Sequence, residues 1–273
     1  MRRGTILEKL RVRATSGMLC GVLLAAHALP LGAHDVWLEP SNYRADGSET
    51  VAIDVLVGER FRGERLPRRP QRIADFRAVG IGWSLPVRGA AGVAPAGVLR
   101  LPAELRGPIA VHYRSRPAAV RLSRQRFLDH LTSEGLEEIA IDPIPATVRE
   151  VYSRCVSALL RIGEGRADPP PAPDCPLVVW PRGDSVVPTA DEPLELVVRK
   201  EGMPVVGIRV SAIHRDDPEH ELSARTDDDG LVRLVLSRPG VWLVKAIHLE
   251  PDRSGEADWR SWWAALTFEV PPR

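Results

Sequence analysis

His34 is the residue of this sequence that could most readily take part in chemistry. The segment Leu31-Gly32-Ala33 precedes it and ends in two small residues, and cleavage after Ala33 would make His34 the first residue of the working protein. A terminal histidine offers a metal ion two nitrogens in one chelate, its α-amine and its Nδ1, and the α-amine loses its proton near pH 8, more readily than a lysine does. The alternative is that processing leaves some residue first and here it is a histidine. The sequence does not distinguish between a metal-binding terminal histidine and a histidine that is first by coincidence.

A second imidazole from elsewhere in the chain would complete a three-nitrogen site suited to Cu, Ni or Co. We expect His248 to supply it, because this residue ends an apparent strand, 241–248, where the strand opens into a loop. His214 also ends an apparent strand and is the second choice. The other histidines are expected to be solvated, either in a charged loop, on the polar side of a helix or at an exposed strand position: His220, His130 and His112.

Other chemical signatures are absent from the sequence. It has no G-x-S-x-G, H-E-x-x-H, C-x-x-C, P-loop or dinucleotide-binding pattern, so we predict that the protein is not an enzyme. A copper oxygenase that uses the terminal histidine is the one enzymatic alternative. Trp262 and Trp263, with Trp259 nearby, would suit stacking on a sugar, but tryptophans in a β-sandwich more often belong to the core.

The first 33 residues are typical of a cleaved export signal. A basic start is followed by a mostly apolar run, 18–31, which is too short to span a bilayer comfortably, and then by small residues. We therefore expect a periplasmic protein that does not span the membrane after cleavage. No later stretch is long and apolar enough for a transmembrane helix.

Removal of the signal changes the charge of the chain. The formal charge is +1, and residues 1–33 hold five Arg or Lys and one Glu, so the mature chain carries 1 − 4 = −3. A nucleic-acid-binding protein would normally show a concentrated basic surface, and we exclude that class. The remaining 273 − 33 = 240 residues suffice for one large or two ordinary domains.

Two cysteines remain after cleavage, Cys155 and Cys175. An even pair in an oxidising compartment favours a disulfide. The alternative is a pair of metal-binding thiolates, but no other His or Cys lies close to them in sequence. We predict the disulfide.

Alternating apolar residues predict a mainly β protein. Two helices are expected in its N-terminal part, one over 124–134 and a second over 148–159, where apolar residues recur at helical spacing. Five strands are expected after Pro176. A proline-rich connector at 169–173 separates the two parts. We therefore predict two β-sandwich-like domains, 34–175 with helical insertions and 176–273.

Five segments in the right order resemble a bacterial periplasmic family of unknown function: 33–40, 127–136, 150–154, 242–248 and 257–262. That family is often described as an accessory, substrate-binding component of nickel/cobalt uptake, and its C-terminal domain is similar to prealbumin-like modules.

The resemblance and the terminal histidine together indicate a periplasmic protein that binds nickel, cobalt or copper for uptake or homeostasis. A membrane metal transporter is the implied partner. The alternative is a non-catalytic envelope module that binds carbohydrate or protein.

Overall fold

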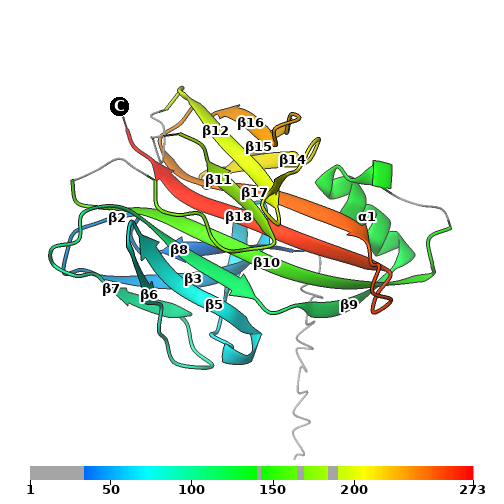
Figure 1. Cartoon of the computed structure of the whole chain (residues 1–273), viewed down its shortest axis with the longest axis horizontal. Coiled ribbons are helices and arrows are strands. Elements are labelled where there is room, and N and C mark those ends of the chain that lie inside the picture. Colours follow the sequence, from blue (N-terminus) through cyan, green and yellow to red (C-terminus); the bar gives the residue numbers. More distant parts are fainter. Residues whose placement is uncertain (1–33, 140–142, 165–168, 184–189, 273) are drawn as a thin grey trace, which may run out of the picture.

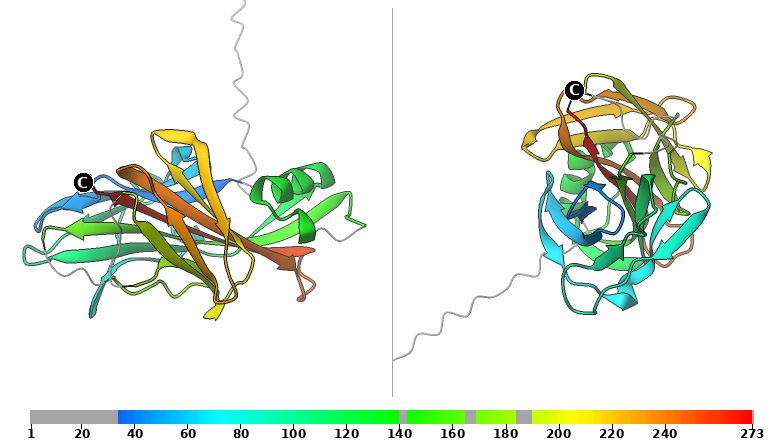
Figure 2. Two further views of the ribbon diagram at one scale, coloured as in Figure 1. Left: turned by 90° about the horizontal axis from the view of Figure 1, so that it is seen from above. Right: turned by 90° about the vertical axis from the view of Figure 1, so that its left-hand side faces the viewer.

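Three layers of β-strands form the protein. The structure, a computed structural model, describes residues 34–139, 143–164, 169–183 and 190–272 (Figures 1 and 2). The predicted mainly β, sandwich-like class is confirmed. The predicted export signal, residues 1–33, lies outside the described residues.

A long central sheet forms the middle layer, and its strands run in the order β15-β14-β17-β18-β10-β8-β5-β6, with β2 and β9 also paired to β10. Most neighbours are antiparallel, but β10 lies parallel to both β18 and β2. The strands are β2 (Arg44–Ala45), β5 (Ile73–Gly80), β6 (Trp83–Pro86), β8 (Gly107–Ser115), β9 (Ala118–Ser123), β10 (Thr147–Ile162), β14 (Arg209–His214), β15 (Asp217–Arg225), β17 (Gly240–Pro251) and β18 (Trp259–Val270).

Two smaller sheets cover opposite faces of the central sheet. The N-terminal sheet contains β1 (Asp35–Pro40), β3 (Thr50–Glu59), β4 (Arg62–Leu66) and β7 (Gly97–Arg100), and the C-terminal sheet contains β11 (Leu177–Pro181), β12 (Pro193–Lys200), β13 (Met203–Pro204) and β16 (Leu231–Val235). Successive side chains of a strand point to opposite faces. Leu243 of β17 therefore packs in the core beneath the N-terminal sheet, whereas Trp242 and Val244 pack beneath the C-terminal sheet.

The predicted helix over 124–134 is confirmed as α1 (Arg124–Glu134). Ser123 caps its first turn, and Gly135 ends it with a left-handed φ of 68°, which favours glycine. Phe127 and Leu131 pack on Leu249 of β17, so α1 covers the same face of the central sheet as the N-terminal sheet does. Two short 3₁₀ turns, η2 (Pro70–Arg72) and η3 (Glu137–Ile139), complete the described elements.

The predicted second helix over 148–159 is wrong. These residues belong to β10, a strand that lies in the interior of the central sheet. Residues 154–160 are buried on both faces of this strand, so apolar residues occur at odd and at even positions. A strand that is apolar on both faces also satisfies helical spacing, and periodicity alone does not distinguish the two.

The central sheet takes strands from both sides of residue 175. Residues Glu150–Ala158 of β10 pair in register with Trp259–Thr267 of β18, and both strands lie well inside the sheet. The predicted division into domains 34–175 and 176–273 stays a prediction, and the sheet runs across it.

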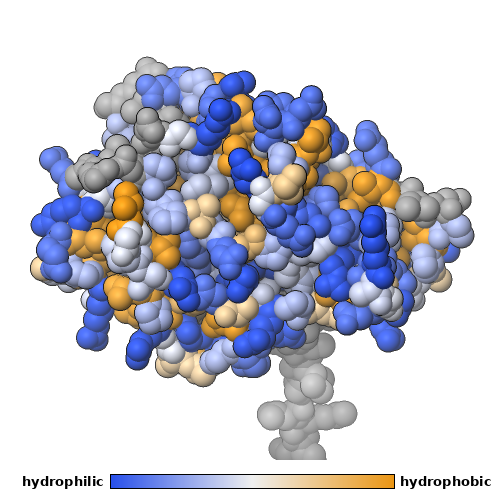
Figure 3. Space-filling model, viewed as in Figure 1, coloured by the Kyte–Doolittle hydropathy of each residue, from blue (hydrophilic) through white to orange (hydrophobic). Residues whose placement is uncertain are grey.

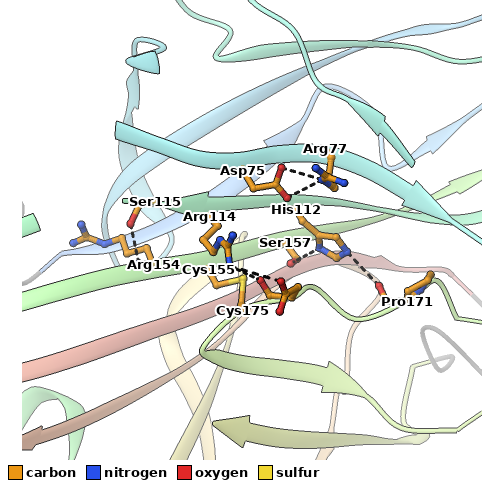
Figure 4. Close-up of a disulfide and its surroundings, with 11 residues drawn as sticks. Asp75, Arg77, His112, Arg114, Ser115, Arg154, Cys155, Ser157, Pro171 and Cys175 are labelled. Carbon is orange, nitrogen blue, oxygen red and sulfur yellow. Dashed lines mark hydrogen bonds and ion pairs between the residues drawn. A yellow bond between two sulfur atoms is a disulfide. The ribbon is translucent and has the colours of Figure 1, made fainter. Parts of the chain in front are cut away.

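The predicted disulfide between Cys155 and Cys175 is confirmed, with their Cα atoms 6.1 Å apart (Figure 4). It joins the middle of β10 to the segment that leads into β11. The connection from the central sheet to the C-terminal sheet is therefore fixed covalently.

His112 lies close to the disulfide and is buried, which corrects its prediction as an exposed strand residue. Burial lowers the pKa of His112 to about 4, so the ring is neutral. Because the Pro171 carbonyl can only accept, Nε2 donates to it over 3.2 Å, and Nδ1 accepts from the Ser157 hydroxyl at 2.8 Å. The buried ring thus anchors the proline-rich connector to β10.

Removal of the disulfide should destabilise the fold without abolishing it. A Cys155→Ala/Cys175→Ala variant should lose about 3 kcal/mol of unfolding free energy, because the open 20-residue loop regains chain entropy in the unfolded state. Urea unfolding with and without reductant measures this. Reductant should lower the midpoint of the wild type only, and equal midpoints of wild type and variant under oxidising conditions would contradict the prediction.

Candidate functional site

A buried ammonium group joins the start of the described chain to the end of α1. Lys245 Nζ lies 2.9 Å from a carboxylate oxygen of Asp35 and 3.1 Å from one of Glu134. The three side chains are only 12%, 9% and 12% exposed, respectively. Both carboxylates therefore pair with the same ammonium group in a place that is shielded from water.

The layers of the fold produce this arrangement. Lys245 lies on β17 two residues from Leu243, so it points to the face that carries the N-terminal sheet and α1. Asp35 is the first residue of β1, and Glu134 is the last residue of α1. Lys245 thus occupies the place where the edge of the N-terminal sheet and the helix approach each other. Thr267 fixes β1 further along the same face, since its hydroxyl donates to the Leu38 carbonyl at 2.7 Å.

Burial and charge act in opposite directions on this cluster. Burial alone would lower the pKa of Lys245, but Asp35 and Glu134 outweigh it and hold that pKa above its ordinary value. Burial raises the pKa of Glu134, which Lys245 opposes. Each charge is therefore stable only while its partners are present.

Arg154 places a second cation beside the first residues of β1. It is 6% exposed, and its Nη2 donates to the carbonyl oxygen of His34 at 3.1 Å. Its guanidinium carbon lies 4.5 Å from the ring centre of Tyr152 and 5.4 Å from that of Trp263. Burial lowers the pKa of Arg154.

His130 completes this buried group. It is 4% exposed, and its ring stacks on Trp263 with ring centres 5.2 Å apart and planes 13° apart. Its Nε2 is buried and has no hydrogen-bond partner among the described residues. Burial, with a smaller effect of Lys245 and Arg154, lowers the pKa of His130 to about 4. The prediction that His130 lies on the polar side of its helix is wrong, and the ring is buried in its neutral form.

Two successive hydrogen bonds fix the position of the Trp263 ring. Its Nε1 donates to the Ser261 hydroxyl at 3.0 Å, and that hydroxyl donates in turn to Glu150, which is fully buried. Trp259 and Trp262 are also buried, so all three tryptophans of this segment belong to the core.

His34 lies at the edge of the same region. Its Nδ1 is 3.0 Å from a carboxylate oxygen of Glu59, and its side chain is 19% exposed. It directly precedes Asp35. The predicted ligand therefore lies next to the buried cluster.

The predicted partner His248 lies on the other face of the central sheet. It is three residues from Lys245 on β17, and it packs on Trp262 and lies 3.1 Å from Glu250 on the C-terminal-sheet side. The substitute His214 is buried with both ring nitrogens hydrogen-bonded, to the Pro239 carbonyl and the Asp216 amide. The structure does not bring His34 and His248 together. Within the described ranges, no three or more His, Cys, Asp or Glu side chains converge as a metal site.

Sequence reasoning missed His130, although a signal for it exists. Residues 127, 130, 131 and 134 follow helical i, i+3, i+4, i+7 spacing, so His130 and Glu134 share the buried stripe of Phe127 and Leu131. Two polar residues on an apolar helix face indicate a buried polar partner.

A family model for a domain of unknown function, DUF4198, matches residues 31–250. The chain belongs to this family. The match includes β1, α1 and nearly all of β17, the three elements that supply Asp35, Glu134 and Lys245. The charge cluster of this DUF4198 protein therefore lies within the matched residues, whereas Trp263 and Ser261 lie beyond them. No curated protein matches the chain.

Several solved structures overlap weakly with this DUF4198 protein. A tetra-tandem repeat of a large adhesion protein is 13% identical with a TM-score of 0.24, and the match covers 86% of this chain and 49% of that one. The adhesin InvE of Yersinia pseudotuberculosis is 12% identical with a TM-score of 0.20, over 87% and 59% of the two chains. Salmonella alpha-2-macroglobulin reacted with methylamine is 11% identical with a TM-score of 0.23, over 87% and 15%. Overlaps this low carry no information on function.

In the described part of the chain, no helix combines the length and the apolar character that a membrane span requires.

Removal of the Lys245 ammonium group should lower the stability of the fold. Lys245→Met should reduce the unfolding free energy by about 3–5 kcal/mol, because two carboxylates stay buried without their cation. Chemical denaturation measures the loss. The triple variant Lys245→Met/Asp35→Asn/Glu134→Gln should recover much of it, since neutral amides avoid the unpaired charge.

An exposed ion pair provides the matched control. Arg233 and Glu195 lie 2.7 Å apart with side chains 61% and 35% exposed, so Arg233→Met should change stability by about 1 kcal/mol or less. If Lys245→Met costs no more than this control, the cluster does not stabilise the fold.

Proposed function

We propose that this DUF4198 protein is an exported, non-catalytic metal-binding protein of the bacterial envelope. Its site would consist of the terminal amine and Nδ1 of His34 and the Nε2 of His130. The observation that carries the proposal is the buried, neutral imidazole of His130, whose Nε2 has no hydrogen-bond partner among the described residues. A buried nitrogen of this kind is costly unless something binds it.

Two separate chains of contacts relate His130 to His34. Glu134, one helical turn after His130, and Asp35, directly after His34, contact the same ammonium group of Lys245. Trp263, which stacks on His130, also lies against Arg154, and Arg154 binds the His34 carbonyl. His130 thus replaces His248, which lies on the opposite face of the central sheet.

The protonation state of the site suits a transition metal. A metal ligand must be unprotonated, and the pKa of His130 near 4 keeps its ring neutral at pH 7. The α-amine that processing would free has an ordinary pKa near 8 and loses its proton readily to a metal. Three nitrogen donors favour Ni, Co or Cu over the oxygen-preferring Mg and Ca. The carboxylates of Glu59, Asp35 and Glu134 offset the positive charge nearby.

The metal would be cargo for uptake or homeostasis, delivered to a membrane transporter. This part of the proposal rests on the resemblance of the sequence to the nickel/cobalt-associated family. A sugar-binding envelope module is the weaker alternative, because all three tryptophans of the segment 259–263 are buried and present no open stacking platform.

Titration calorimetry with Ni(II), Co(II) and Cu(II) tests the proposal on mature protein whose sequence is shown to begin His-Asp-Val-Trp. At least one metal should bind, and His130→Phe should weaken it at least tenfold, because phenylalanine retains a ring beside Trp263 but offers no nitrogen. A protein with one extra residue before His34 should weaken to a similar extent, since its amine no longer chelates.

His220→Phe serves as the control, because the side chain of His220 is 82% exposed and pairs with Asp217 on β15, the edge strand of the central sheet. It should bind like the wild type. Equal affinity of the wild type, His130→Phe and the extended protein for all three metals would overturn the proposed site.

A further inference from the structure

A second site lies where the N-terminal sheet meets the central sheet on the side of η2. A pocket of about 130 Å³ opens between the end of β4, the segment through η2, the end of β8 and the middle of β10. The proposed metal ligands His34 and His130 do not line it, whereas Arg154, which donates to the His34 carbonyl, does. The two sites therefore have different ligands and are tested by separate titrations.

Arginines dominate the polar lining of this pocket. Five of them line it, and no Asp or Glu is among its described lining residues: Arg68, Arg69, Arg72, Arg116 and Arg154. In the described chain, no carboxylate lies within ion-pair distance of the first four of these. By contrast, other surface arginines, such as Arg65, Arg77 and Arg149, each pair with an aspartate. The pocket therefore concentrates positive charge in a mature chain whose formal net charge is negative.

Hydrogen bonds fix the chain segments that carry these arginines. The Arg116 amide donates to the Arg72 carbonyl at 2.8 Å, and the Arg72 amide donates to the Arg69 carbonyl at 2.8 Å. Arg68 is fixed by its side chain, which donates to the Ala96 carbonyl at 2.7 Å and lies over the ring of Phe76. Three separate segments of chain thus present guanidinium groups to one opening.

The inner end of the pocket combines a cation with an aromatic and apolar floor. Arg154 lies over Tyr152. Its amide donates to the Ser115 hydroxyl at 3.0 Å, and Figure 4 marks this hydrogen bond with a dashed line. Tyr113 forms another part of the wall; burial raises its pKa, and the positive charges of Arg154, Arg68 and Arg72 oppose that rise. The remaining lining is largely aliphatic: Val36, Val55, Leu66, Pro67, Ile73, Ala96 and Ala118.

These features define the chemistry of a ligand. Guanidinium groups bind carboxylates in a planar, bidentate manner and stack on aromatic rings. A buried cavity of about 150 Å³ accommodates a benzene ring, which sets the size of the apolar group that fits here. We propose that this pocket binds a small organic carboxylate, with its carboxylate toward the arginines and an apolar body no larger than a benzene ring on the aliphatic floor.

Mature protein titrated with benzoate at about 0.15 M salt tests the proposal, with acetate, inorganic phosphate and benzylamine as comparison ligands. Benzoate should bind at least tenfold more tightly than acetate, because only benzoate fills the apolar floor. It should likewise exceed phosphate, which lacks an apolar body. Benzylamine has the same ring with a positive charge and should not bind.

The variant Arg72→Gln/Arg116→Gln should weaken benzoate at least tenfold, since both side chains are exposed and their removal should leave the fold intact. Arg233→Gln, on the C-terminal sheet, is the matched control and should bind like the wild type, with thermal unfolding confirming that all three proteins are folded. Benzoate binding no tighter than acetate or phosphate, equal binding of benzylamine, or full affinity in the double variant would each overturn the proposal.

The face of the molecule drawn in Figure 3 is mostly hydrophilic, with apolar areas between the polar side chains.

Discussion

The contact of Lys245 with Asp35 and Glu134 is the interaction on which the candidate site depends. Its ammonium group joins three elements that are distant in sequence: the first strand, the end of the helix and a strand in the interior of the central sheet. The chain that begins at the predicted cleavage point is thereby held against the central sheet. This contact keeps the residue before Asp35 near the helix that carries His130.

Burying a cluster of charged groups between two layers of a fold costs desolvation free energy. Apolar residues of similar volume often stabilise a fold as well or better. Here the cluster is continuous with other buried polar groups, namely Arg154, His130 and the Glu150–Ser261 pair. The face of the sheet between the N-terminal sheet and α1 therefore carries a continuous group of buried polar residues. On the face beneath the C-terminal sheet, buried polar side chains such as His112 and His214 pack against tryptophans of the apolar core. Polar groups retained at such a cost are reasonable candidates for function.

Much of the fold follows from the sequence, but the site follows only in part. Alternation in 50–57 predicts a strand, and the helix with Phe127 and Leu131 is predictable because one of its faces is apolar and its end carries a glycine. The strand β10 satisfies helical spacing because both of its faces are buried in the middle of the sheet. The disulfide follows from the number of cysteines that remain after export. His248 ends a run of strand-like residues, which favours it as a ligand in the sequence, yet residue parity on β17 places it on the wrong face of the sheet. The order of the strands in the sheet determines which histidines lie on the same face. A single sequence contains little information about the pairing of strands that are distant in the chain.

X-ray absorption spectroscopy of the nickel-loaded mature protein tests the central claim most directly, because it reports the ligands of the metal itself. We predict a shell of nitrogen donors with two imidazoles, one from His34 and one from His130, and the loss of one imidazole in His130→Phe. A spectrum with a single imidazole, or one that is unchanged in His130→Phe, would contradict the claim that the buried histidine of α1 and the first residue of the mature chain bind one metal.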